Sequence, residues 1–163
     1  MRIGFDGRYA EGDLVGVGKY IKALVMGLDE LGVECVIFYS KKPKYLIAGR
    51  NTKSIVLPKS NRITFEQIFI PIALKKYQID IYHATGNMGI PLFSNVKSVL
   101  TIHDLIPLQY ENYFSYSKFP FLSRLFLHLT YLSRIGMVIS MIANPLSRFR
   151  YILLRTVAYH LRN

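Results

Sequence analysis

The chain has 163 residues, 51% of them hydrophobic, which is enough for one domain with a substantial core but leaves no room for a second full domain. Its single cysteine, Cys35, excludes an intramolecular disulfide, and the apolar run around it predicts a buried thiol. The formal net charge of +11 favours anionic partners, although charge alone does not choose among nucleic acid, anionic lipid and phosphorylated substrates.

The first residues do not resemble a signal peptide. Residues 1–6 include two charged side chains and no long apolar region, so we expect a cytoplasmic protein. The most apolar stretch, residues 119–142, contains Arg124, His128 and Arg134. Each of these side chains is costly at the centre of a bilayer, so the stretch is not predicted to span a membrane.

Short β-rich runs alternate with helical patterns, which is typical of a parallel sheet with crossover helices. The sequence therefore predicts an α/β fold, a Rossmann-like parallel sheet flanked by helices. The predicted strands are residues 2–5, 33–39, 54–57, 80–83 and 98–103. Polar residues appear at the carboxyl ends of several of these strands, where open α/β sheets bind their ligands.

Two helices are predicted between these strands. Apolar residues at helical spacing indicate the first over residues 17–31, with Gly32 as its stop. Residues 41–53 are expected to form a surface loop. Thr64 and Gln67 fit a capping box at the start of the second helix, which Pro71 should bend.

The glycine-rich turn Gly16-Val17-Gly18 opens the first helix, so its backbone amides could face an anion or a sugar hydroxyl. It is not a nucleotide motif. The dinucleotide fingerprint would need glycine in place of Ile21, and a phosphate-binding loop would need Ser or Thr in place of Tyr20. The alternative is a turn followed by a helix cap.

Two histidines, His83 and His103, each end a predicted strand and are expected at the same rim of the sheet. No third ligand lies at a short fixed spacing, so no metal is predicted, and His103-Asp104 is read as a sugar-binding or hydrogen-bonding pair. Asp6 follows the first strand and is either a further polar group of the rim or the side chain of an Asx turn.

The end of the chain is strongly cationic. No Asp or Glu follows Glu111, whereas seven Lys and Arg residues do, and apolar residues between 114 and 129 separate some of them. This pattern fits an anionic membrane surface, or alternatively a core helix with a solvated basic face. Nucleic acid is not expected as a partner, since neither a basic recognition helix nor a stacking aromatic motif is evident.

Taken in order, five segments resemble the family-4-like (group 1) retaining glycosyltransferases of the B-type fold, especially mannosyltransferase-like members. These are Ile3-Gly4-Phe5-Asp6-Gly7-Arg8, Gly16-Val17-Gly18-Lys19-Tyr20, Phe65-Glu66-Gln67 with Pro71, Asp80-Ile81-Tyr82-His83, and Thr101-Ile102-His103-Asp104-Leu105-Ile106-Pro107. The likeness is good over residues 1–111 and weaker afterwards.

The resemblance implies an amino-terminal, acceptor-side domain over residues 1–150 and a basic tail over residues 151–163. The donor-binding carboxy-terminal domain of the family would be absent, or supplied by a separate chain. The implied site residues share the rim of the sheet. His103 would contact the transferred sugar with Asp104 bracing it, and Gly16, Val17, Gly18, Tyr20, His83 and Asp6 would line the substrate side.

The implied activity is transfer of a hexose such as mannose from a nucleotide diphosphate sugar to a lipid-linked or polysaccharide acceptor. No cofactor is implied, since no Asp-x-Asp cluster for magnesium occurs. The domain alone is expected to be inactive. The alternative is a non-catalytic peripheral membrane or partner-binding module derived from such a domain, attached to the inner face of the cell membrane through its cationic segment.

Overall fold

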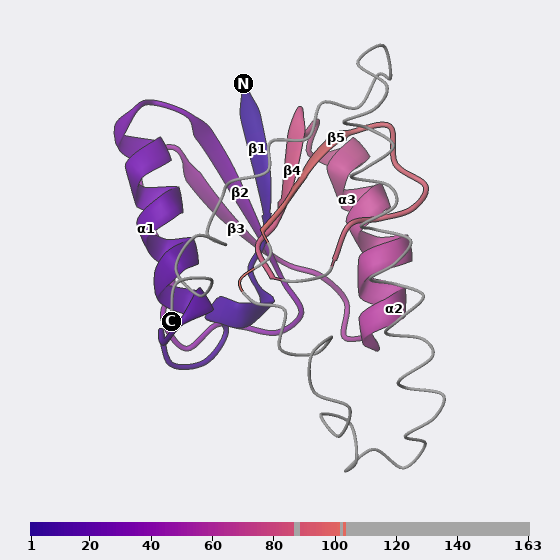
Figure 1. The fold of residues 1–163 in the computed structure, drawn as a ribbon, viewed down its shortest axis with the longest axis horizontal. Helices are drawn as coiled ribbons and strands as arrows, with labels where there is room; N and C mark the ends of the chain where they lie inside the picture. Colours follow the sequence, from indigo (N-terminus) through magenta and orange to yellow (C-terminus); the bar gives the residue numbers. More distant parts are fainter. Residues whose placement is uncertain (87–88, 102, 104–163) are drawn as a thin grey trace, which may run out of the picture. The chain divides into compact units, whose positions relative to one another are not determined.

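The computed structural model describes residues 1–86, 89–101 and 103 (Figure 1). The chain divides into two compact units, and the second begins at His103, the only described residue that belongs to it. The predictions for Asp104, for the cationic segment after Glu111 and for the basic tail 151–163 lie outside the described residues. Among the residues that are described, no helix is long and apolar enough to cross a membrane.

The described unit is built on one parallel sheet of five strands in the order β3-β2-β1-β4-β5. The strands are β1 (Arg2–Asp6), β2 (Glu34–Tyr39), β3 (Thr52–Val56), β4 (Ile81–Ala84) and β5 (Lys97–Leu100). Helices flank this sheet, which confirms the predicted Rossmann-like α/β fold. The first strand lies in the middle, between β2 and β4.

Helix α1 (Val17–Glu30) covers one face of the sheet, and α2 (Arg62–Thr64) and α3 (Ile70–Lys76) cover the other (Figure 1). The fully buried Ile21 and Val25 of α1 pack in one cluster with Phe5, Ile37 and other inward side chains of β1 and β2. The helix ends as predicted at Gly32, whose φ of 75° is left-handed. The amides of Gly32 and Val33 donate to the carbonyls of Asp29 and Leu28, which is the Schellman arrangement.

The other helical layer runs without interruption through α2 (Arg62–Thr64), the π-helical turn η2 (Phe65–Phe69) and α3 (Ile70–Lys76). Phe65, Ile70 and Leu74 are buried on its inner side. The irregularity expected at Pro71 takes the form of the π-helical turn, which immediately precedes the start of α3. Proline has no amide hydrogen to donate, which favours a wider turn before it. In this turn each amide donates to the carbonyl five residues earlier, as the Ile70 amide does to the Phe65 carbonyl.

The predicted capping box was wrong. The cap is Asn61, whose Oδ1 accepts a hydrogen bond from the Thr64 amide at 2.9 Å. Thr64 therefore lies one turn inside the helix. The Gln67 side chain does not return to the helix start; its Nε2 donates to the Ile90 carbonyl at 3.2 Å and its Oε1 accepts from the Leu92 amide at 2.8 Å.

Two strand boundaries differ from the sequence prediction by more than one residue. β3 begins at Thr52, two residues before the predicted start, because Thr52 pairs with Cys35 of β2. β5 ends at Leu100, so the prediction that His103 ends this strand was wrong. Thr101 still donates its amide to the Ala84 carbonyl at 3.0 Å, which holds the first residue after β5 against the end of β4.

Candidate functional site

The strand order reverses between β1 and β4. The chain leaves β1 toward β2 and β3 on one side and returns to β4 and β5 on the other. In open α/β sheets, ligands bind outside the carboxyl ends of the strands at this switch point. The residues at the carboxyl ends of β1, β4 and β5 are therefore the candidates for a site, and they form two polar clusters.

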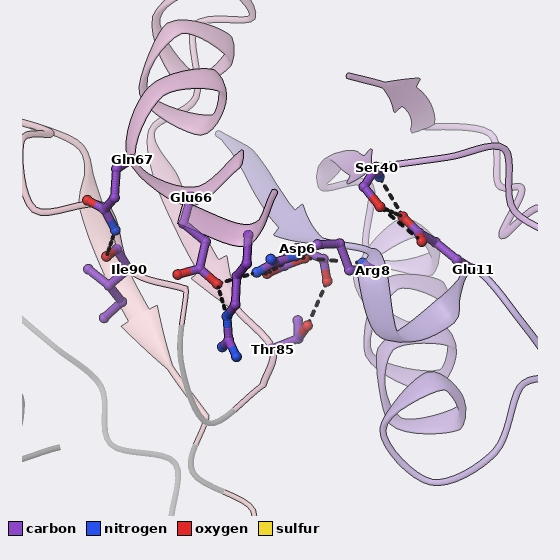
Figure 2. A network of polar contacts seen from close by, with 9 residues as sticks. Asp6, Arg8, Glu11, Ser40, Glu66, Gln67, Thr85 and Ile90 are labelled. Atoms are coloured by element: carbon purple, nitrogen blue, oxygen red, sulfur yellow. Dashed lines mark hydrogen bonds and ion pairs between the residues drawn. The ribbon is translucent and has the colours of Figure 1, made fainter. Parts of the chain in front are cut away.

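The first cluster is an ion network around Arg8 (Figure 2). The Arg8 guanidinium lies 2.6 Å from Asp6 Oδ2 and 2.7 Å from Glu66 Oε1, which joins the end of β1 to η2. Arg62 approaches the same Glu66 oxygen at 2.7 Å. Asp6 Oδ1 also accepts from the Arg8 amide at 3.1 Å, so the Asx turn considered for Asp6 is present.

This network balances its own charge. Two guanidinium groups face two carboxylates, and Asp6 and Glu66 are 0% and 4% exposed. Burial lowers the pKa of Arg8, but its hydrogen bonds and ion pairs with Asp6 and Glu66 outweigh burial and leave that pKa above its ordinary value. Arg8 also stacks 4.6 Å from the centre of the Phe65 ring. The arrangement acts as a brace between segments rather than as a receptor for an anion.

The segment after β4 packs on the turn after β1. Thr85 is fully buried, and its hydroxyl donates to the Asp6 carbonyl at 2.6 Å. Gly86 lies against the Tyr9 ring so closely that an added Cβ would fall 2.2 Å from Tyr9 Cε2. A side chain at position 86 would therefore have to displace the Tyr9 ring, which is 44% exposed.

The second cluster joins Tyr20, His83 and Thr101 from three different elements. The Thr101 hydroxyl is 2.7 Å from His83 Nε2 and 3.1 Å from the Tyr20 hydroxyl. The Tyr20 and His83 rings meet edge to face with centroids 6.3 Å apart. His83 and Thr101 are 5% and 2% exposed, so this cluster fixes α1, β4 and the end of β5 in one arrangement.

The two glycines of the glycine-rich turn have different surroundings: Gly16 is open and Gly18 is packed. Gly16 caps α1 with a φ of 47°, and among the described residues nothing lies within 4 Å of a Cβ added there. Gly18 is buried, and its added Cβ would lie 2.9 Å from the Tyr9 carbonyl oxygen. The close approach that Gly18 permits is therefore to the backbone of the protein itself, whereas Gly16 and the half-buried Val17 begin the helix at the carboxyl edge of the sheet.

The structure thus brings Tyr20 and His83 together, while Asp6 belongs to the separate ion network. His103 is half-buried and Asp104 lies outside the described residues. Among the described residues, no three His, Cys, Asp or Glu side chains are grouped so that they could hold a metal ion. Sequence reasoning did not single out Arg8, Glu66, Thr85 or Thr101, although all except Thr85 lie within the segments that carried the family resemblance.

Comparison with known proteins supplies the family. The family model described as Glycosyltransferase Family 4 matches residues 15–141. No curated protein and no solved structure matches the chain. The match covers most of the chain, including the glycine-rich turn, the helix that carries Glu66, the strand that carries His83, and Thr101. The chain therefore belongs to Glycosyltransferase Family 4, as the amino-terminal domain of a group 1 glycosyltransferase.

Proposed function

We propose that this domain is the acceptor-side half of an enzyme that moves a hexose, such as mannose, from a nucleotide diphosphate sugar to a lipid-linked or polysaccharide acceptor. Family membership implies a sugar donor and an acceptor in general terms. The observation that carries the proposal is that, in a family-4 domain, the buried polar clusters of Arg8 and Thr101 lie at the carboxyl edge of the sheet, beside the switch point.

In the proposed reaction, this half of the enzyme positions the reacting groups and provides fixed dipoles. Retaining transfer breaks a sugar–phosphate bond with oxocarbenium-like charge and a diphosphate leaving group, so preorganised polar groups provide most of the stabilisation. We assign His103 to the transferred sugar and Asp104 to bracing it. Gly16 and Val17 are assigned to the substrate side, with Gly18, Tyr20, His83 and Asp6 supporting them.

The cations that stabilise the diphosphate are assigned to a donor-binding domain outside residues 1–150, with residues 151–163 as a basic tail. A single wall of the site cannot exclude water from the reacting groups or hold the leaving group. The 163-residue chain is therefore expected to transfer no sugar by itself. Activity is expected when a matching donor domain is supplied by fusion or as a separate chain.

The test is turnover of the reconstituted pair. Tyr20→Phe removes only the hydroxyl that lies 3.1 Å from Thr101, and His103→Ala removes the proposed sugar contact. We expect His103→Ala to lower kcat strongly and Tyr20→Phe to lower it less, while Lys22→Ala, an exposed change on α1, leaves it unchanged. Turnover by the isolated chain would contradict the half-enzyme proposal, and a reconstituted enzyme indifferent to His103→Ala would remove only that residue's role.

A second candidate is a non-catalytic peripheral membrane or partner-binding module. It is favoured by the acid-free sequence after Glu111, which carries seven Lys and Arg residues. The two candidates differ in one measurement. A module of this kind would bind vesicles or a partner yet remain inactive with every donor domain and nucleotide sugar supplied.

A further inference from the structure

The helical layer formed by α2, η2 and α3 has a second apolar side that faces away from the sheet. Ile63, Ile68 and Ile72 are 58%, 51% and 60% exposed, whereas Phe65, Ile70 and Leu74 of the same layer are buried. Ile68 and Ile72 are four residues apart, which places them on one side of a helix. The wider π-helical turn brings Ile63, five residues before Ile68, toward the same side.

The loop before β5 adds two larger apolar side chains. Leu92 and Phe93 are 65% and 87% exposed. Gln67 holds this loop against the helix, since its amide nitrogen donates to the Ile90 carbonyl (Figure 2). Its amide oxygen accepts from the Leu92 backbone amide. We call these exposed side chains the apolar ridge. Its members are Ile63, Ile68, Ile72, Leu92 and Phe93.

The segment from residue 57 to 79, which carries the three isoleucines of the ridge, exposes basic side chains and no acidic one. The next residue, Asp80, is exposed and accepts a hydrogen bond from the Arg2 amide. Between residues 57 and 79, all of which the structure describes, the exposed cations are Lys59, Arg62, Lys75 and Lys76. Glu66 is the only acid in this range, and it is buried and neutralised by Arg8 and Arg62. The sequence from residue 86 to 97 contains no acid and ends in Lys97.

We propose that the apolar ridge docks the protein on an anionic lipid bilayer. Phe93 and Leu92 would enter the boundary between headgroups and acyl chains with the three isoleucines beside them, while the cations remain among the headgroups. Each Lys or Arg near an anionic membrane surface adds to the attraction, which weakens as the salt concentration rises. This inference goes beyond the proposed transfer reaction and does not depend on it.

The charge distribution favours a bilayer over a second copy of the chain. A symmetric dimer would place the same patch on both subunits, so Lys75, Lys76 and Arg62 would meet cations of the same kind. An anionic membrane instead supplies both an apolar layer and the opposite charge.

The first experiment uses the fact that the chain contains no tryptophan. Phe93→Trp in the full chain places the protein's single tryptophan at the ridge, where it can be excited selectively over the tyrosines. Leu31→Trp, at a position 79% exposed beyond the end of α1, provides the control. The vesicles contain phosphatidylcholine with phosphatidylglycerol and no glycolipid. We expect a blue-shifted emission and quenching by brominated acyl chains for the tryptophan at position 93 and neither for that at position 31. Unchanged emission at position 93 on vesicles that bind the protein would overturn the proposal.

The second experiment measures vesicle flotation for the double variant Ile68→Ser/Phe93→Ser beside Leu31→Ser. All three positions are exposed, so the variants should retain the thermal stability of the parent. We expect partitioning onto anionic vesicles to fall by roughly tenfold or more for the double variant and to stay at the parental value for Leu31→Ser. Parental binding by the double variant would overturn the proposal, as would loss of self-association in sedimentation with vesicle binding intact.

Discussion

Removing the Arg8 guanidinium would leave Asp6 and Glu66 as buried carboxylates without their shared partner. Loss of one partner from a buried ion pair typically costs about 3–5 kcal/mol, so we expect Arg8→Met to reduce the free energy of unfolding by that order. The matched control is Arg62→Met, which removes an i,i+4 partner of Glu66 that is 46% exposed and should cost about 1 kcal/mol or less. Urea denaturation of both variants measures the difference, and equal losses would show that the network is not a brace.

Thr101 is expected to stabilise the carboxyl edge through its hydroxyl rather than its methyl group. Thr101→Val keeps the shape of the side chain but removes the hydrogen bonds to His83 and Tyr20, at a cost of about 1–3 kcal/mol. Thr101→Ser keeps the hydroxyl and loses one buried methyl group, at a cost of about 1 kcal/mol. Urea denaturation at neutral pH should therefore rank the valine variant as the less stable, and the reverse ranking would rule out this role.

At the scale of elements, Asp29 connects the end of α1 to the segment before β3. Its carboxylate accepts hydrogen bonds from the Arg50 and Asn51 amides and the Thr52 hydroxyl at 3.0, 2.7 and 2.8 Å. A carboxylate in the last turn of a helix opposes the helix dipole, so this placement is favourable only through those contacts. Gly49 makes room for them, since a Cβ added there would lie 2.4 Å from Asp29 Cγ.

This connection predicts a pH dependence. Burial raises the pKa of Asp29, but the hydrogen bonds from Thr52, Asn51 and Arg50 outweigh burial and lower that pKa below its ordinary value. The stabilisation is therefore fully present above the unfolded-state pKa of about 4 and is lost as pH falls through the folded-state pKa. We expect Asp29→Asn to be less stable than the parent at pH 7 and to approach it in acid. Urea midpoints over that range test this, with the exposed Glu30→Gln as control; a constant difference between Asp29→Asn and the parent would contradict it.

Most elements could be predicted because hydrophobic periodicity is local, whereas the errors arose where distant residues intervened. The predicted cap was Thr64, whereas the observed cap is Asn61, and the contacts of Gln67 with Ile90 and Leu92 could not be read from the sequence. The site shows the same limit. Tyr20 and His83 were expected at the rim, but their meeting through Thr101, 81 and 18 residues away, depends on the packing of three elements.

At the scale of the whole molecule, Cys35 reports on global unfolding. The thiol is 1% exposed in a strand inside the sheet, and burial, with the nearby Asp29 carboxylate adding to it, raises its pKa to about 11. Only about one thiol in a thousand would be ionised at pH 8, and the thiolate is the reactive form. We expect a disulfide reagent to label the native chain far more slowly than the chain in urea. Rapid stoichiometric labelling of the native protein would contradict the buried position of this strand.

The central position of β1 also determines the order in which its two neighbouring strands can pair with it during synthesis. The strand that leaves the ribosome first needs a neighbour on each edge: β2 pairs with it from Glu34, but β4 reaches it only from Ile81. A nascent chain that has passed Val56 can form the three-stranded half of β1, β2 and β3, with the other edge of β1 still bare. Such an edge is a template for pairing with another chain. Until β4 emerges, β1 is therefore an exposed edge strand prone to aggregation, although it is the central strand of the finished sheet.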